Sequence, residues 1–186
     1  YENFEFFFNK TTDLVCVANL EGYFVKINKA FTELLGYTEK ELTSNLFINY
    51  VHPDDVSKTL EELNNLKNGE NTFSFGNRYF KKNGEIMWLQ WIATINTQTK
   101  VVFAIARDIT AIKITQEKLT LSEKLLNESQ KMAKIGSWHF DVKTNVLLWS
   151  NEMYNIFEIE KESEDLYKKF LERLTKDGVD YLNNLT

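Results

Sequence analysis

The chain has 186 residues, of which 43% are hydrophobic, and its 22 Lys and Arg against 27 Asp and Glu give a formal net charge of −5. No apolar run reaches the roughly 18 residues of a membrane-spanning helix, and no basic stripe suits a nucleic-acid backbone. We therefore expect a cytoplasmic globular chain without membrane or nucleic-acid partners, and the first residue, Tyr rather than Met, indicates a fragment of a longer protein.

A β-hairpin followed by short helices is predicted for the first part of the chain. The β-prone apolar runs at 13–19 and 23–27 are separated by a glycine-containing turn. A short helix is predicted at 28–35, and the capping-box sequence Thr38-Glu39-Lys40-Glu41 opens a second one. Pro53 starts a third helix, because its fixed φ suits the first helical position.

Three β-strands are predicted next, over residues 72–81, 85–96 and 100–108. Their large side chains alternate along the sequence, as the two faces of a strand require, and Asn83-Gly84 is a two-residue hairpin signal. Two strands, several short helices and three strands in this order predict a sheet with helices on one face. The other face is then left for a covering element or a partner molecule.

The side chains that point toward the helices are expected to enclose a pocket. The candidate pocket residues are Phe47, Phe73, Phe75, Asn77, Tyr79, Leu89 and Trp91. Asn77 would place an amide among apolar groups, where it needs a hydrogen-bond partner from either a ligand or the backbone. Trp88 and Ile92 point to the other face of the sheet, and two large apolar groups there make them candidates for an interface.

A linker helix is predicted over residues 111–134. Helix-forming residues replace the strand pattern, and the pairs Leu119 with Leu126 and Leu125 with Met132 are each seven positions apart. Small polar residues near this partial heptad stripe argue against a strong autonomous coiled coil. We expect instead a homodimer contact that the neighbouring domains support.

An internal repeat relates the beginning and the end of the chain. At an offset of 122 positions Ile27 meets Trp149, and Phe31 meets Met153. The pattern of strand, turn, strand, cap and helix recurs in the same order. The second copy stops before its last three strands would begin, so residues 135–186 are predicted to be the first half of a second domain.

Motifs along the chain resemble the PAS family. The matching segments of the first copy are residues 21–31 with Leu35-Gly36-Tyr37, then His52-Pro53-Asp54-Asp55, then Arg78-Tyr79 with Lys82-Asn83-Gly84, and finally Arg107-Asp108-Ile109-Thr110. The segment that starts at Ile135-Gly136-Ser137-Trp138 is similar to the start of another PAS domain. It departs from the pattern at Leu174-Thr175-Lys176-Asp177, where His-Pro-Asp-Asp is expected.

The resemblance implies an α+β fold with a five-stranded antiparallel sheet and flanking short helices, in a cytoplasmic sensory module of a bacterial signalling protein such as a sensor histidine kinase. It implies a PAS domain at 1–110, a signalling helix at 111–134 and a truncated second PAS domain at 135–186. Asp108 and Thr110 would form the junction that passes a change in the domain into the helix. The resemblance implies that these two residues make hydrogen bonds or a salt bridge that ties the last strand to the helix, with Arg78 and Arg107 as the candidate partners.

Other residues whose side chains could bind a metal or take part in a reaction are interpreted as structural. His52 precedes a proline at a helix start, where a structural or surface role is favoured over haem ligation. Cys16 lies in an apolar strand, as small core residues do, and a single cysteine excludes a disulfide framework and a cysteine-based metal cluster. Asp54 and Asp55 suit the dipole of a helix N-terminus. His139 has no companion ligands at metal spacing.

These observations predict a non-catalytic sensory and dimerisation module that takes a small-molecule ligand in its pocket, with no metal and no tightly bound cofactor. The catalytic output domain, such as the histidine kinase of a two-component system, is expected outside this chain. A protein-interaction scaffold with a self-filled core is one alternative, and a flavin-binding redox sensor is another. An absorption spectrum without a visible band would exclude the flavin alternative.

Overall fold

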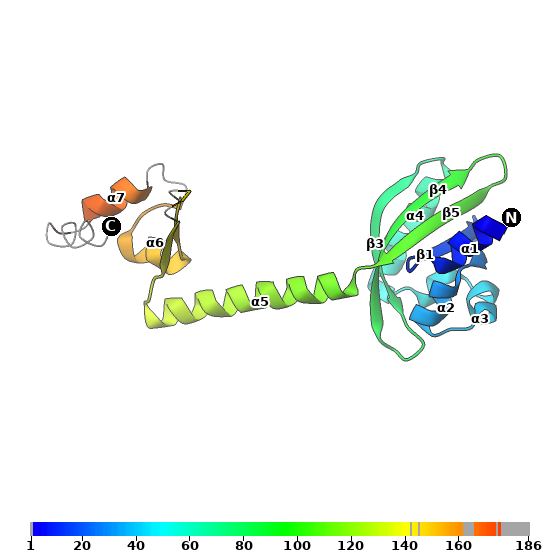
Figure 1. The fold of residues 1–186 in the computed structure, drawn as a ribbon, viewed down its shortest axis with the longest axis horizontal. Coiled ribbons are helices and arrows are strands. Elements are labelled where there is room, and N and C mark those ends of the chain that lie inside the picture. The colour runs from blue at the N-terminus through cyan, green and yellow to red at the C-terminus, as the bar shows by residue number, and fades with distance from the viewer. Residues whose placement is uncertain (1, 142, 145, 162–165, 174, 176–186) are drawn as a thin grey trace. The chain divides into compact units, whose positions relative to one another are not determined.

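The computed structural model describes residues 2–141, 143–144, 146–161, 166–173 and 175 (Figure 1). The chain divides into two compact units, Tyr1–Thr115 and Gln116–Thr186. Among the described residues, no helix combines the length and the apolar character that crossing a membrane requires.

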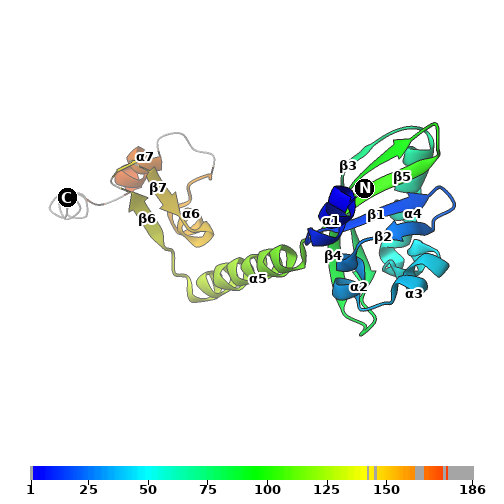
Figure 2. The same ribbon diagram turned by 45° about the vertical axis from the view of Figure 1, so that its right-hand side comes forward.

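The first unit is built on one five-stranded sheet. Its elements are α1 (Glu2–Lys10), β1 (Leu14–Asn19), β2 (Phe24–Ile27), α2 (Lys29–Leu35), α3 (Glu39–Ser44), the 3₁₀-helix η1 (Phe47–Tyr50), α4 (Pro53–Lys67), β3 (Thr72–Phe80), β4 (Ile86–Asn96) and β5 (Val101–Asp108). The strand order is β2-β1-β5-β4-β3, and all neighbouring strands are antiparallel (Figures 1 and 2). The predicted α+β fold class is confirmed.

Local signals determine where the short helices begin and end. The Thr38 hydroxyl accepts a hydrogen bond from the Glu41 N–H at 3.2 Å, and the Glu41 carboxylate accepts one from the Thr38 N–H at 2.8 Å. This reciprocal pair is the predicted capping box at the start of α3. Helix α2 ends at Gly36, whose φ of 79° is a left-handed conformation that glycine adopts without a steric penalty.

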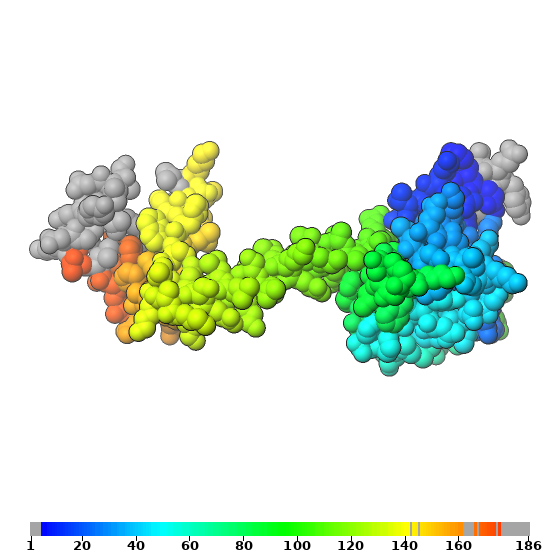
Figure 3. Space-filling model, turned by 90° about the horizontal axis from the view of Figure 1, so that it is seen from below, coloured from blue at the N-terminus to red at the C-terminus, as the bar shows by residue number. Residues whose placement is uncertain are grey.

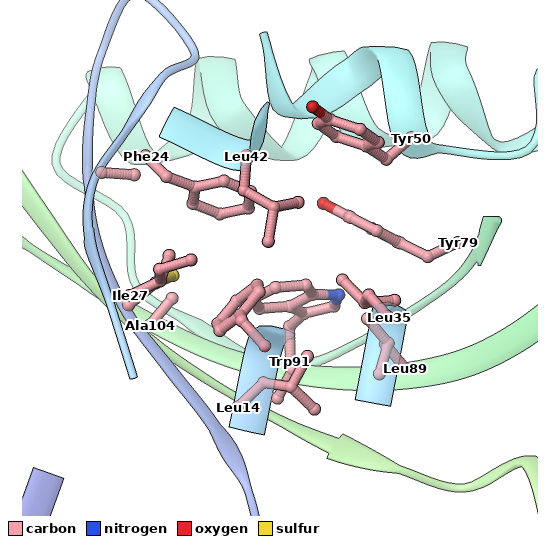
Figure 4. Packing of buried hydrophobic residues seen from close by; sticks show 14 of the residues in the cluster. Leu14, Phe24, Ile27, Leu35, Leu42, Tyr50, Tyr79, Leu89, Trp91 and Ala104 are labelled. Atoms are coloured by element: carbon pink, nitrogen blue, oxygen red, sulfur yellow. The ribbon is translucent and has the colours of Figure 1, made fainter. Parts of the chain in front are cut away.

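The core of the first unit lies between the sheet and the helices α2, α3 and α4. Leu35 of α2 and Leu42 of α3 are fully buried against the inward side chains of the sheet, which include Leu14 and Leu89 (Figure 4). Truncation of such a leucine to alanine costs about 2–5 kcal/mol of stability. The inner face of the sheet is therefore held firmly by the helices that cover it.

A bulge interrupts the alternation near the start of β3. The pairing of β3 with β4 shifts between Thr72, which lies opposite Ala93, and Phe75, which lies opposite Trp91. Thr72 and Phe75 consequently both face the interior, whereas Phe73 is 78% exposed. The prediction that Phe73 faces the pocket is wrong, because the extra residue of the bulge reverses the direction of the side chains before it.

A buried ion pair joins α4 to β3. Asp55, in the first turn of α4, is 2% exposed and accepts hydrogen bonds from Arg78 Nε at 2.9 Å and Nη2 at 2.8 Å. Its carboxylate also accepts the backbone N–H of Arg78 at 2.8 Å. The hydrogen bonds from Arg78 hold the pKa of the Asp55 carboxyl well below its usual range. The sequence predicts only a helix-dipole role for Asp54 and Asp55, so this pairing of Asp55 is an additional finding.

The second unit contains a small hairpin and short helices. Its described strands and shorter helices are β6 (Trp138–Asp141), β7 (Val146–Trp149), α6 (Asn151–Phe157) and α7 (Leu166–Arg173). Strand β7 and helix α6 begin and end 122 positions after β2 and α2, which is the offset of the sequence repeat. The ring of Trp149 packs on those of Tyr154, Phe157 and Phe170, with centroids 5.3–5.4 Å apart. Trp138 is 54% exposed.

Helix α5 (Thr110–Ala133) follows β5 in the chain and none of its residues is buried. Its side chains are in view along the helix in the space-filling representation (Figure 3). The apolar interface candidates Leu119, Leu125, Leu126 and Met132 are 54–84% exposed. The predicted helix is therefore present, and its partial apolar stripe is open to solvent.

We predict that Asp55→Asn lowers the free energy of unfolding by about 3 kcal/mol at pH 7, because it removes the buried one of the two carboxylates that pair with the Arg78 guanidinium. Urea unfolding of the 186-residue chain measures the change. The matched control is Asp54→Asn, since the Asp54 side chain is 70% exposed and its pairing with Arg78 is correspondingly weak. Equal unfolding midpoints for wild type and Asp55→Asn would contradict the prediction.

The same ion pair predicts acid sensitivity. The pKa of Asp55 is lower in the folded state than its ordinary value of 3.8, so in acid the unfolded state binds more protons. The stabilisation by the ion pair is complete above the pKa that Asp55 has in the unfolded state. It is lost as the pH falls from that value through the lower pKa that Asp55 has in the folded state. We expect the free energy of unfolding to decline below about pH 5, and to decline less steeply in Asp55→Asn. Identical pH profiles for the two proteins would rule this out.

Candidate functional site

A cavity of about 80 Å³ lies between the inner face of the sheet and α4. Of the predicted pocket residues, those that line it are Phe47, Phe75, Asn77, Tyr79 and Trp91. Leu89 is fully buried in the core beside them but does not line the cavity, and Phe73 is on the outside. Trp91, Tyr79 and Phe24 point toward one another in Figure 4, and the rings of Tyr79 and Trp91 are 5.8 Å apart.

A chain of hydrogen bonds forms the polar side of the cavity. The indole N–H of Trp91 donates to Asn77 Oδ1 at 2.8 Å, and Asn77 Nδ2 donates to Thr59 Oγ1 at 3.1 Å. The Thr59 hydroxyl in turn donates to the backbone carbonyl of Asp55 at 2.7 Å. The partners of the buried Asn77 amide are therefore two side chains, rather than the ligand or backbone group expected from the sequence. Together these bonds connect β4, β3 and α4.

The remaining polar groups of the cavity wall are neutral or lie toward α4. Burial raises the pKa of the Cys16 thiol and that of the Tyr79 hydroxyl, so both stay protonated at neutral pH. Glu62 of α4 accepts a hydrogen bond from the hydroxyl of Thr72. The wall is otherwise mostly apolar, so this site suits binding of a small, largely apolar molecule that offers a hydrogen-bonding group.

The volume sets a limit on that molecule in the present conformation. Each water molecule in the liquid occupies about 30 Å³, and drug-sized ligands use pockets of roughly 300–1,000 Å³. A cavity of about 80 Å³ accommodates a few non-hydrogen atoms.

A second group of hydrogen bonds attaches α5 to the sheet. The carboxylate of Asp108 accepts the backbone N–H of Thr110 at 2.8 Å and also accepts the Thr110 hydroxyl. Thr110 Oγ1 accepts the backbone N–H of Trp88 at 2.9 Å, and the Trp88 carbonyl accepts the N–H of Ile109 at 2.9 Å. Both backbone groups of Trp88 are thus bound to the first residues of the junction.

Of the two expected alternatives at Asp108, the junction has the hydrogen bonds, and the salt bridge to Arg78 or Arg107 is wrong. Arg78 pairs with Asp55 on α4, and Arg107 pairs with Asp13, with Nη2 and Oδ2 3.2 Å apart. Asp108 instead bonds to Thr110, two residues along the chain, because a carboxylate readily accepts backbone and hydroxyl donors this close to it.

Trp88 and Ile92 differ in their surroundings on the outer face of the sheet. The Trp88 ring is half-buried, with the guanidinium of Arg78 at 5.2 Å and the Nζ of Lys113 at 5.4 Å from its centroid. Ile92 is 58% exposed. Of these two interface candidates, Trp88 is therefore covered in part by its own chain, and Ile92 remains open.

Thr59 is the member of the site that the sequence does not point to. It lies one helical turn after Asp55 and one turn before Leu63, on the side of α4 that faces the cavity. This i, i+4 spacing of Asp55 and Thr59 is the available signal, since both are polar residues on a face that also carries leucines. His52 takes a structural place, because its Nδ1 accepts the N–H of Asp54 at 3.3 Å at the start of α4.

The geometry defines the first unit as a cavity-bearing α+β domain whose last strand leads directly into a helix. A family model described as PAS fold matches residues 24–106. The fold and this match together show that the first unit belongs to the PAS family.

Two known proteins with similar sequences carry names of signalling enzymes. The probable diguanylate cyclase DgcE of Escherichia coli (strain K12) is 28% identical over 150 residues, which cover 78% of this chain and 14% of the relative. The sensor histidine kinase TmoS of Ectopseudomonas mendocina is 25% identical over 129 residues, which cover 67% of this chain and 13% of the relative. The chain therefore spans about one seventh of the length of either relative.

A solved structure has the same fold. A domain of the sensory box sensor histidine kinase/response regulator from Geobacter sulfurreducens superposes with a TM-score of 0.52 at 20% identity. The superposition covers 57% of this chain and 92% of that domain. At this identity the likeness establishes the fold alone.

We predict that Asn77→Ala lowers the free energy of unfolding by about 1–3 kcal/mol, because it leaves the Trp91 indole N–H and the Thr59 hydroxyl without their shared partner. Urea unfolding gives the stability, and the NMR signal of the Trp91 indole proton reports the lost bond. The control is Asn71→Ala, which removes an exposed amide that accepts from Thr94. An unchanged indole signal together with unchanged stability would refute the role of Asn77.

Proposed function

We propose that the chain is a non-catalytic sensory and dimerisation module whose catalytic output domain lies outside this sequence. Its parts are a PAS domain at 1–110, a linker helix at 111–134 and the first half of a second PAS domain at 135–186. The match to DgcE supports this organisation, because it covers 78% of the chain and so extends beyond the first unit of 115 residues. The common offset of β7 and α6 from β2 and α2 supports the second PAS domain.

The observation that carries the proposal is that β4 contributes to both the cavity and the junction. Trp91 lines the cavity, and three residues earlier both backbone groups of Trp88 are hydrogen-bonded to Ile109 and Thr110. A ligand that shifts β4 therefore also shifts the start of α5. A ligand can bias such an equilibrium only as far as it binds the two conformations with different affinities.

The output of the parent protein is proposed to be an enzyme regulated through this helix. The printed names of the relatives describe a diguanylate cyclase and a sensor histidine kinase, and in each the matched segment is a small part of the length. Of these, a histidine kinase of a two-component system is our proposal for this chain, in a bacterial cytoplasm.

A homodimer is the proposed assembly. The apolar side chains of α5 at Leu119, Leu125, Leu126 and Met132 are 54–84% exposed, and two of their spacings are those of a heptad. A second copy of the helix would bury them. Ile92 on the sheet offers a further exposed apolar group for such a contact.

A scaffold with a self-filled core is the second candidate. It is favoured by the hydrogen bonds of Asn77 to Thr59 and Trp91, which satisfy the cavity amide without a ligand. Native mass spectrometry of protein isolated under mild conditions separates the two candidates. A retained small molecule supports the sensor, and its absence together with no response to an added ligand supports the scaffold.

We predict that xenon, which binds apolar cavities, shifts the amide NMR signals of both the cavity residues and residues 109–113. In Asp108→Ala the cavity signals should still respond. The response of 109–113 should be smaller, because the bonds between Asp108 and Thr110 are lost while those of Trp88 to Ile109 and Thr110 remain. Glu21→Ala, at an exposed site in the turn between β1 and β2, is the control and should respond as the wild type does. A response confined to the cavity residues of the wild type would contradict the proposed coupling.

A further inference from the structure

The indole ring of Trp88 is in contact with cations from two elements. The Arg78 guanidinium comes from β3, directly across the sheet pairing, and the Lys113 ammonium comes from the first turn of α5. Both lie within 5.4 Å of the ring centroid, a distance at which a cation is attracted to the face of an aromatic ring. These contacts involve side chains, so they are separate from the backbone bonds of Trp88 to the junction.

On the cavity side, Arg78 is held by the helix that forms the cavity wall. Its guanidinium is bound by the buried Asp55 at the start of α4, and the next turn of the same helix places Thr59 at the cavity. Arg78 also directly follows Asn77 in β3, whose amide bonds to Thr59. A displacement of α4 or β3 at the cavity therefore moves the guanidinium.

On the helix side, Lys113 has the Trp88 ring as its neighbour. Among the described residues, no carboxylate lies within ion-pair distance of Lys113, whereas Arg78 is neutralised by Asp55 and Asp54. The contact with the ring thus fixes the Lys113 side chain where no carboxylate competes for it. The backbone N–H of Lys113 donates to the carbonyl of Ile109 at 2.9 Å, so Lys113 belongs to the turn that begins the helix.

We propose that Trp88 acts as a positioning residue that couples the cavity to α5 through its side chain. The path of the coupling begins at the cavity and ends at the helix, and its members in order are Thr59, Asp55, Arg78, Trp88 and Lys113. This inference rests on the proposed sensory function and specifies its regulation. A shift of α4 moves Arg78, the ring follows the guanidinium, and Lys113 follows the ring. The first turn of α5 is thereby reoriented even though the hydrogen bonds of Asp108 and Thr110 stay intact.

The test uses the whole chain with xenon as the probe and follows the amide NMR signals of residues 109–113. Trp88→Leu removes the ring and keeps both backbone bonds of Trp88, and Lys113→Gln removes the cation at the surface. The matched control is Lys124→Gln, on the same helix. In both test variants we expect the xenon response of residues 109–113 to fall by roughly two- to fivefold, the equivalent of one exposed cation–π contact. The signals of the cavity residues should respond as in the wild type.

The outcomes separate this inference from the proposed function. A full response of residues 109–113 in Trp88→Leu or in Lys113→Gln overturns the relay and leaves the sensory function standing. An equal loss in Lys124→Gln also overturns it, because the effect would then belong to helix charge in general. Absence of any response at 109–113 in the wild type would instead refute the proposed function itself. Lys113→Gln keeps the test decisive if Trp88→Leu does not fold.

Discussion

The ion pair of Asp55 with Arg78 is the interaction on which the geometry of the first unit depends. A carboxylate that is 2% exposed is stable only if it is paired, and here the side chain and the backbone of Arg78 bind it, together with Lys58 Nζ at 3.2 Å. It fixes the start of α4 against β3. Because α4 supplies Thr59, Glu62, Leu63 and Leu66 to the cavity, the ion pair also determines where the cavity wall lies.

Strand β4 connects the inside of this domain with its exit. Trp91 and Trp88 are three positions apart, so their side chains lie on opposite faces of the sheet. Trp91 bonds to Asn77 inside the domain, and Trp88 contacts Lys113 and the junction outside it. A strand with both roles brings the cavity and the start of the helix within three residues of each other.

The sequence predicts the face of the sheet to which a side chain points better than it predicts the residue to which that side chain binds. The two-residue period correctly places Asn77 and Trp91 inside, but it fails for Phe73, since nothing in the composition marks the bulge before Phe75. The partner of Asn77 is Thr59, which depends on how α4 packs on β3 and not on any local pattern. The ionic partner Arg78 is equally hidden, because it lies 23 positions from Asp55 and only the tertiary fold brings the two together, whereas Lys58 pairs with Asp55 from three positions along the same helix. The repeat at an offset of 122, by contrast, is visible in the sequence and matches the bounds of β7 and α6.

The central claim is that the state of the cavity changes the first turn of α5. Native-state hydrogen exchange of the Lys113 amide, which bonds to the Ile109 carbonyl, measures this most directly in wild type and in Thr59→Val. The substitution removes the hydroxyl that links Asn77 to α4 and adds no bulk. We predict faster exchange at Lys113 in Thr59→Val, with no change at Gly22 in the turn between β1 and β2. An unchanged exchange rate at Lys113 would contradict the account.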